Sequence, residues 1–200
     1  MIDPGDRRGG LDVNYKLPGL RNWMSIYMDS FVHDDPSPLA APNRAAFHPG
    51  FYVSHMPGLP KLDFRAEAAY TELPTEPNYN NYFFYTNSNY RDGYTQEGSI
   101  IGDWVGREGK GGQLSSTYWL TPDRTLQVYW RNHMVASEFI PGGAHQNDLG
   151  AVIQYAIGAH FQAGGTFQYE TYNIPFLTAG RQSDVTVALT LSYWPHQHAK

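Results

Sequence analysis

Two neighbouring segments of the sequence concentrate side chains that proteins use to hold sugars. The first, NYNNYFFYTNSNYRDGY, is dense in Asn and Tyr. A Tyr ring offers an apolar face on which a sugar ring can stack, and Asn amides hydrogen-bond to hydroxyl groups. We therefore predict glycan contact here, with an ordinary strand rim rich in Tyr as the alternative. The candidate binding residues are Tyr82, Tyr85, Asn87, Tyr90 and Tyr94.

The second segment, IGDWVGREGKG, places charged residues and a Trp among closely spaced glycines. Such a loop can fold into a pore and narrow it, and Arg107 or Lys110 can hold an acidic sugar through charge-assisted hydrogen bonds. Asp103 and Trp104 complete the candidate set. The alternative is a solvated loop with internal salt bridges. The glycines do not lead from a strand into a helix, so a phosphate-binding loop is excluded.

Residues for catalysis or metal binding show no comparable pattern. A glycosidase needs two carboxyl groups that flank one bond. Glu138 and Asp148 flank a Gly-rich stretch, but nothing in the sequence pairs them. The chain has no Cys, and the His-x-His pair near its end has no third ligand in view. We predict no enzyme activity, no metal and no cofactor.

Composition narrows the class of protein. The net charge of -5 argues against nucleic-acid binding. Hydrophobic residues make up 41% and aromatic residues 15%, which is not the profile of a disordered chain. A mean hydropathy of -0.51 is typical of soluble proteins. Membrane β-barrels share that value, because half of each strand faces a polar lumen.

Alternation with a period of two residues recurs along the chain and predicts β-strands. The clearest case is VTVALTLSYW, in which Val, Leu and Tyr occupy the odd positions from Val185 to Tyr193. The even positions hold small or weakly polar residues. The other predicted strands are 11–17, 23–29, 61–71, 113–120, 125–134, 149–158 and 166–172, with a weaker candidate at 51–56.

Connections of two lengths alternate between these strands. The short ones begin at Pro18, Pro57, Thr121 and Phe161, and the long ones cover 32–50, 73–112, 137–147 and 174–183. Hairpins of outer-membrane barrels have short periplasmic turns and long outer loops. The pattern predicts an all-β, antiparallel transmembrane β-barrel with about eight to ten strands in this chain. The odd positions of 185–193 would face lipid.

Several stretches resemble the Wzi family of capsule assembly proteins, from about Gly9 to the C-terminus. The residues that carry the resemblance are GGLDVNYKLPGLRNWMSIYMDSF, DDPSPLAAPNRAAFHPGFYV, PGLPKLDFRAEAAYTELP, YRDGYTQEGSIIGDWVGREGKG, SEFIPGGAHQNDLG and GRQSDVTVALTLSYWP. Their order and spacing carry it, since no single motif is decisive.

The resemblance implies an outer-membrane barrel of about eighteen strands, of which this chain would hold the C-terminal part. We expect a truncated or flexible start at 1–8, barrel strands and loops at 9–195, and a periplasmic tail at 196–200. An open half-barrel would leave two unpaired edges in lipid. The chain would therefore pair with a missing N-terminal half of the same barrel, or close as a smaller one.

The resemblance also implies the function. The protein would act in the cell outer membrane as a non-catalytic lectin that helps to assemble or attach capsular polysaccharide. Its partners would be capsular or extracellular polysaccharide and outer-membrane lipid, with no nucleic acid. One alternative is a general porin, whose Gly-rich loop narrows an aqueous channel. Another is a soluble carbohydrate-active β-sandwich, whose apolar strand faces would form a core.

Overall fold

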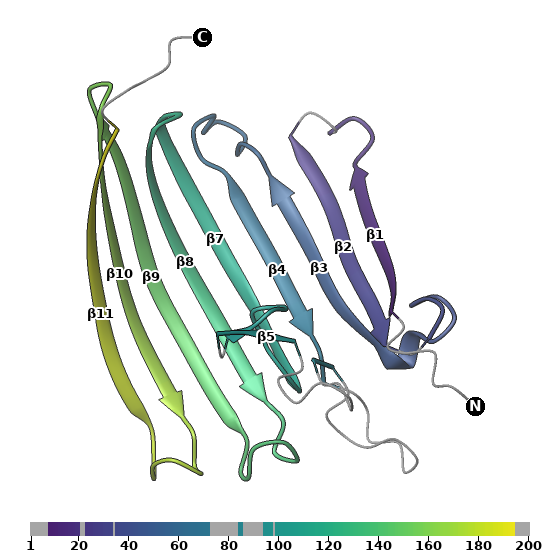
Figure 1. Cartoon of the computed structure of the whole chain (residues 1–200). Coiled ribbons are helices and arrows are strands. Elements are labelled where there is room, and N and C mark those ends of the chain that lie inside the picture. The colour runs from purple at the N-terminus through teal and green to yellow at the C-terminus, as the bar shows by residue number, and fades with distance from the viewer. Residues whose placement is uncertain are drawn as a thin grey trace.

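The computed structural model describes residues 8–20, 23–33, 35–72, 84–85, 94–97 and 99–194. These residues form one antiparallel sheet of nine strands in the order β1-β2-β3-β4-β7-β8-β9-β10-β11 (Figure 1). The strands are β1 (Arg8–Lys16), β2 (Met24–His33), β3 (Ala45–Val53), β4 (Phe64–Tyr70), β7 (Gly109–Thr121), β8 (Arg124–Val135), β9 (Ala144–Ile157), β10 (Phe161–Asn173) and β11 (Gln182–Tyr193). The predicted all-β class is confirmed, and the number of strands lies within the predicted range.

The elements outside this sheet are small. A two-stranded sheet of β5 (Thr95–Gln96) and β6 (Ser99–Ile100) lies in the long connection between β4 and β7. A short 3-10 helix, η1, covers Pro42–Arg44. Within the described residues, no helix has the length and apolar character needed to span a bilayer.

Several strand boundaries were predicted wrongly, among them the start of β7 at Gly109 within the predicted connection 73–112. The FQAGG stretch at Phe161 belongs to β10, and the turn before it lies at 158–160. Strand β3 begins at Ala45, inside the segment predicted as a loop, and β9 begins at Ala144 rather than after Asn147. Phe161, Gly164 and Gly165 stay in the ladder because each pairs with residues of both β9 and β11. Pairing on both sides thus overrides the low strand propensity of glycine.

The pairing register places one apolar row across all nine strands. Each member lies directly opposite the next, and the row consists of Tyr15, Ile26, Phe51, Ala66, Leu114, Trp130, Leu149, Tyr169 and Val185. Neighbouring residues point to the opposite face of a sheet. The adjacent row on that face is Asn14, Tyr27, Gly50, Glu67, Gln113, Arg131, Asp148, Glu170 and Asp184. The sheet therefore has one apolar face and one polar face.

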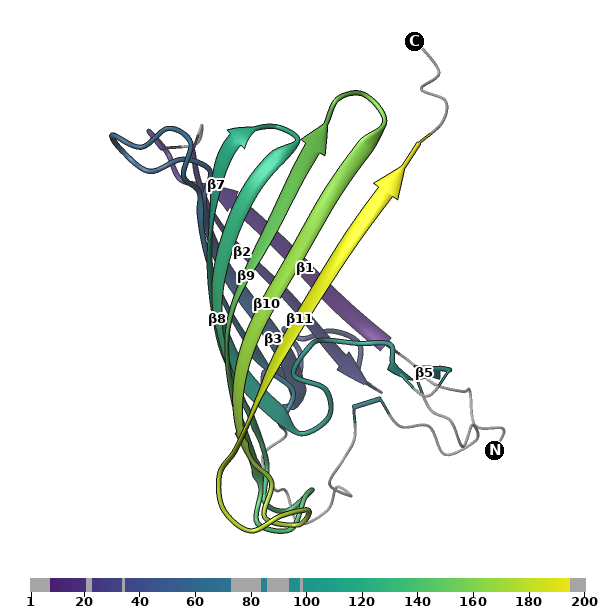
Figure 2. The same cartoon turned by 90° about the vertical axis from the view of Figure 1, so that its left-hand side faces the viewer.

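The sheet is strongly curved, and the part of the β4–β7 connection around β5 lies on its concave side (Figure 2). The polar row shares this side, while the apolar row faces outward from the convex side. Leu189 is 85% exposed and Leu191 is 71% exposed. Within the described residues, no second sheet covers the convex face, since β5 and β6 belong to the connection on the other side. The β-sandwich alternative requires such a layer and is not supported.

Successive connections lie alternately at opposite ends of the sheet (Figure 1). We call the end with the turns after β1, β3, β7 and β9 the short-turn end, and the end with the connections after β2, β4, β8 and β10 the long-loop end. The predicted division by length is wrong for the β3–β4 connection, which covers 54–63 and is longer than the connections 136–143 and 174–181. Strands β1 and β11 are the edges of the sheet, which is open. Of the two alternatives for these edges, closure as a smaller barrel is therefore wrong for the described strands.

Candidate functional site

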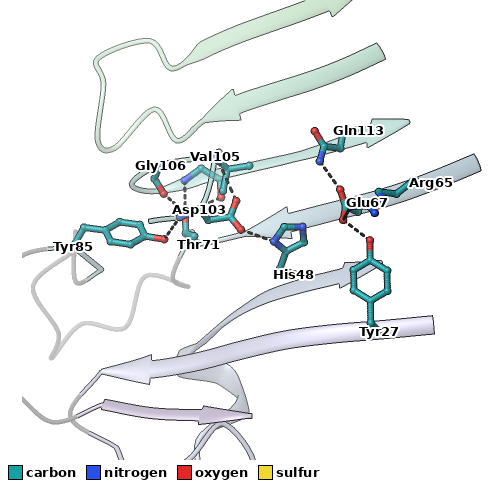
Figure 3. A network of polar contacts seen from close by, with 11 residues as sticks. Tyr27, His48, Arg65, Glu67, Thr71, Tyr85, Asp103, Val105, Gly106 and Gln113 are labelled. Atoms are coloured by element: carbon teal, nitrogen blue, oxygen red, sulfur yellow. Dashed lines mark hydrogen bonds and ion pairs between the residues drawn. The ribbon is translucent and has the colours of Figure 1, made fainter. Parts of the chain in front are cut away.

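The β4–β7 connection is anchored to the concave face by its residues 103–106, which we call the inner loop (Figure 3). A carboxylate oxygen of Asp103 lies 2.7 Å from the Nδ1 atom of His48 on β3. The Thr71 hydroxyl donates to the carbonyl oxygen of Gly106 over 2.7 Å. The backbone N–H of Val105 donates to Asp103 over 3.1 Å, which fixes the turn of the loop itself. These contacts tie the inner loop to β3 and to the residue that directly follows β4.

A pocket of about 650 Å³ opens between the inner loop and the first three strands at the long-loop end. Asp12 and Asp29, which lie opposite each other on β1 and β2, are exposed and line it. His48 contributes from β3, and Tyr85 and Trp104 contribute from the β4–β7 connection. The volume falls within the range of small-molecule sites, which is roughly 300–1,000 Å³. Carboxylates and aromatic rings thus share one cavity.

A small apolar cluster supports the aromatic side of this pocket. Phe84 is 1% exposed and packs against Tyr85 and Ala46. Its ring meets that of Phe31 edge-on, with 4.8 Å between ring centroids. Tyr94 packs against the same cluster, and the guanidinium carbon of Arg8 lies 3.3 Å from the centroid of its ring. The pocket therefore rests on a packed core and not on an exposed loop alone.

Tyr85 combines backbone strain with burial. Its φ is +63°, in the left-handed region that bulky residues rarely occupy. Its hydroxyl accepts a hydrogen bond from the backbone N–H of Asp103 over 3.0 Å, and burial raises the pKa of the phenol. A Cβ at Gly102 would lie 2.3 Å from the Tyr85 ring, so the ring packs directly on that glycine. Strained residues held this way are concentrated at functional sites.

Two buried nitrogen atoms of the pocket-lining side chains have no hydrogen-bond partner within the described residues. They are the indole Nε1 atom of Trp104, which carries a hydrogen, and the imidazole Nε2 atom of His48. Leaving a buried polar group unpaired costs about 1–3 kcal/mol. Such atoms call for polar partners that the described chain does not supply.

The structure brings only some of the predicted binding residues together. Asp103, Trp104 and Tyr85 line the pocket, and Tyr94 supports it through the apolar cluster. Tyr82, Asn87 and Tyr90 lie outside the described residues.

The two predicted sugar-binding cations lie elsewhere. Arg107 packs against the β8–β9 connection, with its guanidinium carbon 5.0 Å from the centroid of the Phe139 ring. Lys110 is a residue of β7 on the convex face, where its Nζ atom lies 2.6 Å from Glu72. Neither residue lines the pocket.

Sequence reasoning missed His48, Asp29 and Phe31 as site residues. The stretch 32–50 was predicted as a loop, which hid the position of His48 in a strand. Alternation at Ala46, His48 and Gly50 was the available signal, because these residues share the concave face.

Charged and amide side chains of the concave wall form hydrogen bonds across strands. Glu67 accepts hydrogen bonds from Tyr27 on β2 and Gln113 on β7 (Figure 3). The Arg131 guanidinium donates to Asp148 over 2.6 Å, and the amide of Gln146 donates to the same carboxylate over 2.9 Å. Arg131 and Asp148 thus form an ion pair across two strands, and Glu67 accepts from two neutral donors. No group of three or more His, Asp or Glu in the described ranges is arranged to hold a metal ion.

Comparison with known families decides the classification. The family model of the capsule assembly protein Wzi matches residues 2–187. The chain belongs to the Wzi family. Its fold is similar to that of the outer-membrane protein Wzi of Escherichia coli, which is involved in group 1 capsule assembly and is described as a carbohydrate-binding β-barrel.

The structural likeness covers only part of the E. coli protein. The TM-score is 0.72 at 22% sequence identity, over 97% of this chain and 43% of the E. coli chain. At that identity the likeness shows the fold alone, and this chain spans less than half of that protein. Comparison with curated proteins gave no match.

Proposed function

We propose that this Wzi-family chain is part of an outer-membrane β-barrel that binds capsular polysaccharide at the long-loop end without catalysing a reaction. The observation that carries the proposal is the register of the sheet. It puts an uninterrupted apolar row on the convex side of all nine strands and a polar row on the concave side. A barrel with lipid outside and water inside needs this division.

The open edges indicate how such a barrel is completed. Nine antiparallel strands leave β1 and β11 running in the same direction. Joining β1 to β11, in one chain or between two copies, would create a parallel pair. Single-chain bacterial barrels are antiparallel with even strand numbers. The complement therefore needs an odd number of strands, which fits the other half of a Wzi-type barrel.

The pocket at the long-loop end supports glycan binding. Trp104 supplies a ring for stacking and an unpaired indole N–H for a sugar hydroxyl, and the Nε2 atom of His48 supplies a second polar contact. Tyr85 is 7% exposed and supports the wall of the pocket. The exposed carboxylates of Asp12 and Asp29 accept hydrogen bonds from hydroxyls and repel anions. Among the described residues, they outnumber the one lining cation, Arg8, whose guanidinium lies over the Tyr94 ring. We infer that the pocket prefers a neutral or amino sugar over an acidic one.

A porin remains the second candidate, because the inner loop lies on the concave wall as a constriction loop would. The two functions differ in measurable ways. The full-length protein, purified in detergent from outer membranes, is tested for retention of capsular polysaccharide and for conductance in planar bilayers. Retention without conductance is the expected result. Conductance without retention would establish the porin instead, and release of new reducing ends would establish a glycosidase.

A matched pair of variants locates the binding. Asp29→Ala removes a carboxylate that lines the pocket, whereas Asp184→Ala removes an exposed carboxylate of the same concave face on β11. We expect roughly tenfold weaker retention for Asp29→Ala only, because one charge-assisted hydrogen bond is lost. Equal losses in both variants would contradict this pocket as the binding site.

A further inference from the structure

A second pocket, of about 520 Å³, lies on the convex face between β8 and β11. We call it the outer pocket. Trp130, Leu149 and Tyr169 line its side toward the middle of the sheet, and all three belong to the apolar row. Asn147, Thr171, Ser183 and Arg181 line the side toward the long-loop end. The outer pocket is thus half apolar and half polar.

The register explains this change in polarity. Two residues beyond the apolar row, toward the long-loop end, Asn132, Asn147, Thr171 and Ser183 lie opposite one another on four successive strands. They share the convex face with the apolar row, because residues two apart point the same way. Trp130 and Tyr169 of the apolar row lie next to these polar residues. In a membrane barrel, Trp and Tyr side chains at such a change in polarity mark the level of lipid headgroups. At the long-loop end this level is the outer leaflet.

Arg181 is the cation of this site. Its Nη2 atom donates to the Thr171 hydroxyl over 2.7 Å. It makes no ion pair within the part of the chain that the structure describes, unlike Lys110 on the same face. The carbonyl oxygen of the Asn147 side chain accepts a hydrogen bond from Asn132 over 2.9 Å, which leaves the Asn147 amide as a donor. A guanidinium held by one hydroxyl and flanked by an amide donor is suited to an anionic oxygen group.

We propose that the outer pocket binds the phosphate of a phosphorylated glycolipid of the outer leaflet. Arg181 contacts the phosphate, Asn147 and Ser183 contact sugar hydroxyls of the headgroup, and the acyl chains lie along Leu149 and Val185. This inference rests on the proposed function, because it requires the convex face to lie in a membrane. It is independent of the pocket beside the inner loop, which lies on the concave face.

The experiment compares two arginines of the convex face. Arg181→Gln removes the cation of the outer pocket. Arg124→Gln is the matched control at the short-turn end, where Arg124 donates to the Ala156 carbonyl oxygen and stacks over Tyr155. The full-length protein is purified from outer membranes, exchanged into detergent and mixed with diphosphorylated lipid A or its dephosphorylated form. Bound lipid is counted by native mass spectrometry.

We expect the wild-type protein and Arg124→Gln to retain phosphorylated lipid A roughly tenfold better than the dephosphorylated form. Arg181→Gln should lose this preference, and Arg181→Lys should restore part of it. Equal retention of both lipids by the wild type, or an unchanged preference in Arg181→Gln, would overturn the outer pocket. Heat-modifiable migration of each variant tests barrel formation separately. A protein that never shows that shift contradicts the proposed membrane barrel, whereas a shift without lipid preference contradicts only this site.

Discussion

The Asp103 carboxylate lies 2.7 Å from the Nδ1 atom of His48, which joins the inner loop to β3. The two residues are far apart in sequence, and both side chains are mostly buried. The contact has two consequences. It holds the inner loop on the concave wall, and it occupies one ring nitrogen of His48 while the other remains without a partner beside the pocket.

Breaking this pair should release the inner loop. In Asp103→Ala, the carboxylate contacts to His48 and to the backbone N–H of Val105 are both lost. We expect trypsin to cleave after Arg107 several-fold faster than in the wild type, because local opening exposes the backbone to the protease. Cleavage is followed by mass spectrometry on the detergent-solubilised protein. Asp184→Ala is the control, and equal cleavage rates in the two variants would contradict the anchoring role.

Two adjacent residues of β11 test whether the convex face contacts lipid or water. Leu189 is 85% exposed on the apolar face, and Thr190 points to the concave side. Leu189→Arg should lower the free energy of unfolding in lipid vesicles by about 2–4 kcal/mol, as Arg does near the bilayer midplane. Thr190→Arg should be tolerated, because the lumen is aqueous. If both variants are equally stable in urea titrations, the convex face does not lie in lipid.

A glycine–tyrosine pair on the concave wall gives a third prediction. Tyr129 lies opposite Gly150, and a Cβ at Gly150 would be 2.3 Å from the Tyr129 ring. In Gly150→Ala the ring must move, which breaks the hydrogen bond from the Tyr129 hydroxyl to Gln168. We expect a loss of about 1–3 kcal/mol in the free energy of unfolding, as for other overpacked sites.

Gly164→Ala is the control for this pair, because its Cβ would meet its nearest neighbour at an ordinary 3.6 Å. It should leave the unfolding midpoint nearly unchanged. A midpoint shift of the same size in both variants would show that general loss of glycine flexibility, and not the Tyr129 ring, explains the effect.

The sequence predicted the strands well because their signal is local. Alternation in Val185–Tyr193 and in Leu126–Trp130 reflects two different solvents on the two faces, so each strand carries its own evidence. The weaker strand β3 was found only in part, since Pro49 and Gly50 interrupt it and mimic a loop. What holds it in the sheet is pairing with β2 and β4, which no local pattern records.

The candidate site was predicted less completely, because it depends on contacts between distant segments. Asp103 and Trp104 were found from their residue types, but the partners His48 and Asp29 come from strands more than fifty residues earlier.

Lys110 shows the opposite error, because it was predicted at the site and lies elsewhere. It looked like a loop cation by composition, yet one-residue alternation in β7 turns it to the convex face beside Glu72.

The last prediction concerns the buried carboxylate of the concave wall. Asp148 has a side chain 1% exposed and accepts hydrogen bonds from Arg131 and Gln146. Asp148→Asn keeps the shape but leaves Arg131 without its counter-charge, and we expect a loss of about 1–3 kcal/mol. The loss is moderate because the Arg131 side chain is 32% exposed and water can solvate it. Arg65→Gln is the control, since Arg65 lies 3.7 Å from Glu67 and is half exposed. Urea unfolding in vesicles should give a clearly lower free energy of unfolding for Asp148→Asn than for Arg65→Gln. The reverse order would show that the Arg131–Asp148 pair does not stabilise the wall.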